Sequence, residues 1–208
     1  MPAELTRAEL PEADLDDDVV HAGLDIRDLD LSGREAAGAE LDQCRYSSVS
    51  FGQVRLRRAT LKDVVFDKCD LANLRARECS IRRASFAASR MTGLTWITGT
   101  MQDVTFDGCR IDLGYFSATK ISDVVFTGCR LDQANFGDAE LSNVRFENCD
   151  LSGVQFSGAR LADTRFAGCV LNGISGVTSL RGASMTSADA VALAVTFAQA
   201  LGISIDED

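Results

Sequence analysis

Seven cysteines and one histidine are the side chains of this sequence best suited to redox chemistry or to metal binding. The cysteines are Cys44, Cys69, Cys79, Cys109, Cys129, Cys149 and Cys169. They form no CxxC pair and only His21 could join them, so we expect no metal site. Their odd number, and an N-terminus that does not resemble a secretory signal, argue against disulfides. We interpret them as small buried apolar side chains, and His21, which lies in an acidic stretch, as a surface residue.

Carboxylates recur at fixed positions of a 20-residue period and could form an acidic binding face. The aspartates at one position are Asp63, Asp103, Asp123 and Asp163, with Arg83 and Asn143 between them, and the acids four residues further on are Asp67, Asp107 and Glu147. We expect all seven to lie across one face, where regularly spaced carboxylates would resemble a line of phosphates. The alternative is a solvated surface that keeps the protein soluble and its strand edges unpaired.

The sequence contains no recognisable catalytic constellation. It has neither a nucleophile elbow nor a phosphate-binding loop. We therefore expect no enzyme activity and no cofactor.

The charge is negative overall but unevenly distributed. The formal net charge is −10, and residues 1–30 hold ten acids and two bases. Residues 55–90, in contrast, hold ten bases and four acids, and the role of this basic band is left open. A net negative chain argues against direct binding of nucleic acid. No apolar run is long enough to cross a bilayer, so we expect no membrane span and a cytoplasmic location.

An uninterrupted period of five residues organises most of the chain. Every fifth residue from Ile26 to Leu171 is apolar or aromatic, which makes 30 consecutive positions. Five residues advance an α-helix by about 500°, and an odd step on a strand changes the face, so neither element keeps these residues on one side. A chain that turns a corner every five residues does, and four such sides close one square coil.

A repeated phrase supports this coil independently. DVVFTGCRL at 123–131 has near-copies that begin at residues 63, 103, 143 and 163. Equivalent phenylalanines and cysteines should therefore stack about 4.8 Å apart, as parallel strands would place them. Small residues two positions before each large one, mostly Cys, Val and Ala, would fill the remaining interior.

The segment ANFGDAELSNVRFENCDLSGVQFSGARLADTRF, residues 134–166, resembles the pentapeptide-repeat family. The resemblance covers residues 24–175 and implies an all-β solenoid, the right-handed quadrilateral parallel β-helix. The chain is most similar to the MfpA and Qnr type, whose members mimic DNA, bind the type II topoisomerase DNA gyrase and protect it from quinolones. Its long acidic N-terminus, its basic band and its lack of a projecting loop depart from that type. The alternative is an interaction scaffold with an unidentified partner, in which the basic band would be the binding surface.

The two ends leave the pattern. Residues 1–23 are expected to form an acidic cap or extension, either a slipped first coil or a solvated segment, and residues 176–208 a capping and dimerisation segment. TSADAVALAVTFAQALG, residues 186–202, predicts one helix, with Thr186 or Ser187 as its N-cap. Because it is apolar on most sides, we expect a homodimer across a two-fold axis. The residues proposed for dimerisation are Val191, Leu193, Val195, Phe197, Leu201 and Ile203. A monomeric cap is the alternative.

Overall fold

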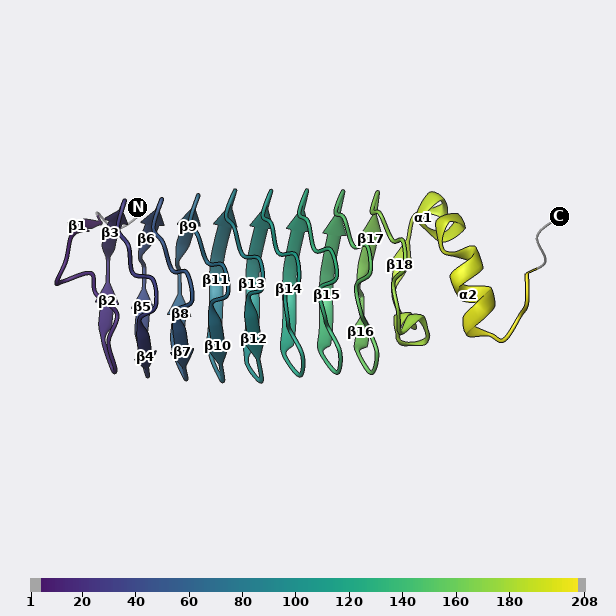
Figure 1. Cartoon of the computed structure of the whole chain (residues 1–208), viewed down its shortest axis with the longest axis horizontal. Helices are drawn as coiled ribbons and strands as arrows, with labels where there is room; N and C mark the ends of the chain where they lie inside the picture. Colours follow the sequence, from purple (N-terminus) through teal and green to yellow (C-terminus); the bar gives the residue numbers. More distant parts are fainter. Residues whose placement is uncertain (1–4, 206–208) are drawn as a thin grey trace.

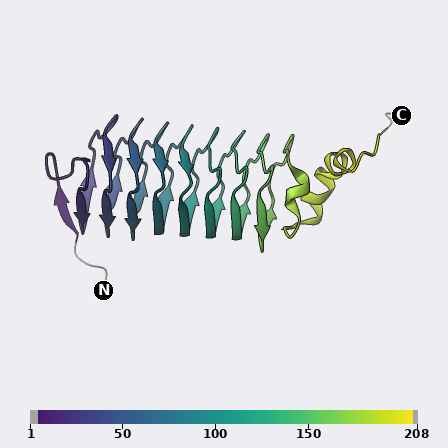
Figure 2. The same cartoon turned by 90° about the horizontal axis from the view of Figure 1, so that it is seen from below.

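The chain folds into a right-handed quadrilateral parallel β-helix. The computed structural model describes residues 5–205. Figures 1 and 2 show the coils stacked along one axis, with α1 (Ser187–Ala192) and α2 (Ala194–Ala200) at the C-terminal end. The predicted fold is thus confirmed.

Each coil has four sides, which we call A, B, C and D in chain order. Side A contains β2 (Val20–Ala22), β5 (Glu40–Asp42), β8 (Thr60–Lys62) and β16 (Arg160–Ala162). Side B contains β1 (Thr6–Ala8), β3 (Leu24–Arg27), β6 (Arg45–Ser47), β9 (Val65–Asp67), β17 (Arg165–Ala167) and β18 (Ser184–Met185). Four longer strands run over both sides: β11 (Ser80–Ala87), β13 (Thr100–Asp107), β14 (Lys120–Thr127) and β15 (Glu140–Glu147).

Sides C and D complete the coil. Side C consists of isolated parallel bridges, from Asp30↔Ser50 to Asp150↔Val170. Side D begins with β4 (Glu35–Ala37), β7 (Arg55–Arg57), β10 (Arg75–Arg77) and β12 (Thr95–Ile97). It continues as single bridges such as Thr95↔Tyr115. These short sides support one another only through the coils above and below.

Equivalent residues of successive coils stack along the axis. Phe86 pairs with Phe106, and Phe106 with Phe126, in adjacent parallel strands. The rings from Tyr46 to Phe166 on side B form one continuous stack, with centroids 4.7 to 5.2 Å apart. The spacing matches the separation of neighbouring strands. The predicted stacking of like residues is confirmed.

A left-handed residue marks most corners of the coil. Asp103, Gly108, Leu113 and Ala118 follow one another at five-residue intervals, with φ of 53°, 58°, 58° and 52°. Such values are easiest for Gly and are tolerated best among other residues by Asn and Asp. Hence the turn positions of this chain are rich in these three residues.

The described N-terminal residues form an incomplete first coil. β1 pairs with β3 so that Thr6 lies against Leu24, two residues short of a full coil, and Leu15 is buried. The slipped-coil alternative therefore describes this segment from residue 5 onward. Regular pairing, coil on coil, begins at β2, before residue 24.

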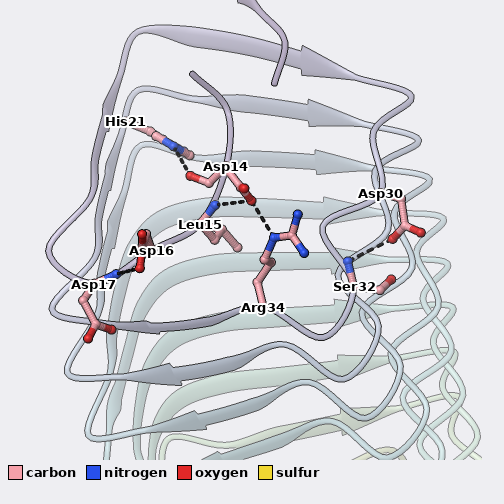
Figure 3. A network of polar contacts seen from close by, with 8 residues as sticks. All are labelled: Asp14, Leu15, Asp16, Asp17, His21, Asp30, Ser32 and Arg34. Atoms are coloured by element: carbon pink, nitrogen blue, oxygen red, sulfur yellow. Dashed lines mark hydrogen bonds and ion pairs between the residues drawn. The ribbon is translucent and has the colours of Figure 1, made fainter. Parts of the chain in front are cut away.

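The prediction that His21 lies on the surface is wrong. His21 is 1% exposed, because the segment before it folds over the ring. Figure 3 shows Asp14 between His21 and Arg34. The backbone oxygen of Asp14 lies 3.0 Å from Nε2 of His21, and the Tyr46 hydroxyl lies 3.2 Å from Nδ1. Since a carbonyl only accepts, Nε2 carries the proton and Nδ1 accepts from Tyr46.

The C-terminal segment closes the last coil with η1 (Val177–Leu180) and two short helices. The predicted C-terminal helix is present, in two segments, because the helix is interrupted at Leu193, with φ −96° and ψ 0°. Leu193 joins the apolar core and is 1% exposed. Among residues 5–205, no helix has the length and the hydropathy needed to cross a bilayer.

Candidate partner-binding surface

The predicted aspartate column follows the corner between sides A and B. Asp63, Asp103, Asp123 and Asp163 all have φ between 50° and 55°. Arg83 and Asn143 occupy the same corner with the same backbone conformation, φ 51° and 52°. The backbone requirement therefore explains part of the preference for Asp and Asn here. It also places each carboxylate at an edge of the rod.

Asp63 does not contribute a free negative charge to this corner. The guanidinium of Arg83, one coil further on, donates to both of its carboxylate oxygens at 2.6 and 2.7 Å. This hydrogen bonding, more than any other contact, lowers the pKa of Asp63. Lys62 lies 3.9 Å from the same carboxylate. The acidic part of the corner therefore begins beyond Arg83.

Asp103 and Asp123 at this corner, together with Asp107 on the adjoining side B, form the group that we call the acidic corner. Asp103 and Asp107 lie on β13, Asp123 lies on the neighbouring β14, and all three are exposed. Within residues 5–205 none of them has a cation within ion-pair distance. Asp123 accepts a hydrogen bond of 2.7 Å from the amide of Asn143.

The second set of predicted acids lies beyond the corner. Asp67, Asp107 and Glu147 fall on side B and not on side A, because the left-handed residue turns the chain before each of them. Arg145 lies 3.7 Å from Glu147 and offsets its charge. Asp163 is exposed at the same corner as Asp123, two coils further on. The structure thus brings together a shorter acidic surface than the sequence suggested.

Four of the six residues proposed for dimerisation are exposed. They are Val191, Val195, Leu201 and Ile203, which we call the apolar end patch. Leu193 is buried within the protomer, and Phe197 is half-buried against the core. Leu193 is therefore not accessible to a second chain, whereas Phe197 keeps part of its ring exposed. The helix is interrupted at Leu193, which points into the core, whereas Val191 and Val195 on either side of it are exposed.

The fold distributes the basic residues of the band over different sides of the coil, which their positions in the sequence did not reveal. Arg55, Arg57, Arg75 and Arg77 project from β7 and β10 on side D. Lys62 and Arg82 lie on side A instead. Arg75 and Arg77 follow Arg55 and Arg57 by one full period of the repeat, which was the signal that could have identified this group.

Sequence comparison assigns the repeat region. The sequence profile of the pentapeptide repeat region matches residues 39–116 and 99–175. The chain belongs to the pentapeptide repeat family. No curated protein has significant sequence similarity to it.

Several solved structures are similar to this pentapeptide repeat protein. A trypsin-treated form of QnrB1, a plasmid-mediated fluoroquinolone resistance protein, is 18% identical, with a TM-score of 0.41, and the match covers 90% of this chain and 100% of that one. HetL of the cyanobacterium Nostoc, involved in heterocyst differentiation regulation, is 16% identical, with a TM-score of 0.33 and coverage of 81% and 87%. Rfr23 of the cyanobacterium Cyanothece is 18% identical, with a TM-score of 0.22 and coverage of 74% and 92%.

The cysteines of this pentapeptide repeat protein lie in its interior. All seven are free and buried, and the thiols of Cys129 and Cys149 lie 3.5 and 3.3 Å from the backbone oxygens of Phe106 and Phe126. Burial raises the pKa of the Cys69 thiol to about 11. No cluster of three metal-ligating side chains occurs in the part of the chain that the structure describes.

Proposed function

We propose that this pentapeptide repeat protein binds a type II topoisomerase, DNA gyrase, by presenting its acidic corner in place of DNA phosphates, and so modulates the enzyme or protects it from inhibitors such as quinolones. The observation that carries the proposal is the exposure of Asp103, Asp107 and Asp123, for which the described part of the chain supplies no cation within ion-pair distance. A basic groove that accepts a duplex is complementary to such a surface.

The rigidity of the rod supports this assignment. Asp103 and Asp123 are attached to β13 and β14, which pair along seven registered positions. Their core neighbours Val104, Phe106, Val124 and Phe126 are buried. The carboxylates are therefore held in place before binding, which reduces the conformational entropy that association would otherwise cost.

A homodimer through the apolar end patch would extend this surface. Side chains such as Leu201, which is 76% exposed, are left largely uncovered by residues 5–205 of one protomer. Exposed apolar side chains that gather on one surface are typical of protein contact sites. A two-fold contact at the C-terminal end would join two rods into one longer acidic body.

Gyrase assays test the proposal directly. The full chain is added to gyrase, and DNA supercoiling and quinolone-stabilised DNA cleavage are measured. We expect the chain to change supercoiling or to relieve the quinolone effect, and the variant Asp103→Lys/Asp107→Lys/Asp123→Lys to lose this activity. Lys68 has φ 52° at an equivalent corner position, so the backbone accepts lysine there.

A matched variant separates the acidic corner from net charge. Asp28→Lys/Asp132→Lys/Asp138→Lys makes the same charge change away from the corner between sides A and B, and it should retain activity. If both variants lost the effect on gyrase equally, the overall charge of the protein and not the acidic corner would account for it. No response of gyrase to the unmodified chain would overturn the proposal and leave an interaction scaffold.

A further inference from the structure

We propose that side D is a second interaction surface, which binds an acidic segment of a partner protein through Arg55, Arg57, Arg75 and Arg77. Ile97 and Tyr115, in the following coils of the same side, would receive an apolar side chain of that segment. The inference does not depend on the proposed function, because side D lies opposite side B, which carries Asp107.

The four arginines form a two-by-two array. β7 and β10 are adjacent parallel strands, with Arg75 in register with Arg55 and Arg77 with Arg57. Alternation along each strand turns Leu56 and Ala76 into the core and leaves all four arginines exposed. Two surface hollows of about 320 and 340 Å³ lie against the array, lined by its side chains together with Glu35 and Gln53, among others. The array thus offers both donors and room for a ligand group.

The array concentrates like charge that the protein itself only partly offsets. Directly opposed like charges on neighbouring strands are destabilising. At one other stacked pair of arginines the charge is shared, because Asp112 lies 3.4 Å from Arg110 and 3.5 Å from Arg130.

Two members of the array lack this compensation. Arg55 contacts Glu35, and Arg77 lies 3.4 Å from Glu78. Neither Arg57 nor Arg75 has a carboxylate within 4.0 Å among residues 5–205. Carboxylates of a ligand would remove the repulsion, and the planar guanidinium groups can hold them in bidentate pairs.

The surroundings favour a protein segment over a nucleic acid. On the N-terminal side the hollow is bordered by Asp17 and Glu35, which would repel an extended polyanion. On the C-terminal side the array gives way to Ile97, half-buried, and Tyr115, 42% exposed. Arginine beside tyrosine and an apolar side chain is typical of protein interfaces. A short acidic segment with one aromatic or aliphatic residue is complementary to this surface, since its acids would meet the arginines and its apolar residue would meet Ile97 and Tyr115.

Peptide binding tests the inference with the full chain. The probe is a fluorescent oligo-aspartate peptide that ends in leucine and phenylalanine, and the readout is fluorescence anisotropy. We expect binding that weakens as salt rises. The variant Arg57→Glu/Arg75→Glu should bind at least about tenfold more weakly.

The control is Arg145→Glu/Arg165→Glu, which reverses two stacked arginines of β15 and β17 on side B. It should change the affinity by less than about twofold. Absence of binding by the unmodified chain, or equal losses in both variants, would overturn the inference. Circular dichroism of both variants verifies that the coil is retained.

Two further measurements define the partner class. Tyr115→Ala should weaken binding of the peptide that carries leucine and phenylalanine, but not of oligo-aspartate alone. An equal effect on both peptides, or none on either, would remove Tyr115 from the surface. Tighter binding of a duplex DNA oligonucleotide than of the peptide would overturn the assignment to a protein segment.

Discussion

Asp189 accepts a hydrogen bond from the backbone N–H of Cys169, one coil earlier, with 3.1 Å between Oδ1 and N. Its other carboxylate oxygen accepts from the N–H of Gly168 at 3.1 Å and from the hydroxyl of Thr186 at 2.6 Å. Asp189 is 4% exposed. One side chain at the start of α1 therefore satisfies two backbone donors at the end of the stack, where residues 5–205 form no further coil to supply acceptors. The role resembles that of Ser89, whose hydroxyl accepts from the N–H of Cys69 inside the stack.

Replacing Asp189 by alanine should destabilise the C-terminal end. The substitution leaves the buried N–H of Cys169 without a partner and removes the acceptor of the Gly168 N–H, which together cost about 2 kcal/mol of unfolding free energy. Denaturant titration measures the loss, and hydrogen exchange at Cys169 should accelerate. Asp107→Ala, at an exposed site, is the control and should change stability by less than about 0.5 kcal/mol. Equal stability of the two variants would exclude the capping role.

The stability of the N-terminal coil should fall in mild acid. Burial lowers the pKa of His21 below its usual 6.5. The unfolded chain therefore binds this proton at a higher pH than the folded chain does. Stability contributed by neutral His21 is complete above pH 6.5 and declines as the pH falls through the folded pKa.

His21 is the only histidine of the chain, so its variant gives a clear test. In His21→Gln the decline in unfolding free energy between about pH 7.5 and about pH 5.5 should disappear, because no group with an ordinary pKa in that range remains. Denaturant titrations at several pH values measure this. An unchanged slope in the variant would place the acid sensitivity elsewhere.

The corner conformation predicts opposite effects for two substitutions. Thr98 is β-branched and has φ 51°, which is unfavourable for such a side chain. Thr98→Gly should raise the unfolding free energy by about 1 kcal/mol. Gly108 has φ 58° and open space around the position of an added Cβ, so Gly108→Val should destabilise through the backbone alone. Thermal denaturation of both variants checks the signs, and a destabilised Thr98→Gly protein would contradict the prediction.

Charge in the apolar end patch should separate a dimer without unfolding the protomer. Val195 and Leu201 are exposed, whereas Phe197 packs on the core. Val195→Asp/Leu201→Asp should therefore yield a monomer by light scattering while the melting temperature of the coil stack is kept. Phe197→Asp is expected to lower that temperature as well. A monomeric unmodified chain at all concentrations would refute the dimer.

Much of the repeat region was predictable, because the same contacts recur at every coil. The positions of Phe106, Phe126 and Cys129 are repeated once per coil, and parallel strands place such residues above one another. The period of five also implied the corners, since only a regular turn keeps the large residues inside. These features depend on local backbone geometry that each pentad carries in its own residues.

The structure of the two ends of the rod and the pairing of its charged side chains depend on contacts that do not repeat from coil to coil. Asp63 and Asp103 occupy equivalent positions of the period, yet only the first is paired, because Arg83 bends back onto it. His21 is buried by the chain before it, and Leu193 interrupts its helix to reach the core. The amino-acid sequence by itself determined the coil, its filled interior and its stacked columns. Only the tertiary structure decided which charges remain free and how the rod is closed, because both depend on where individual side chains meet neighbours outside the repeat.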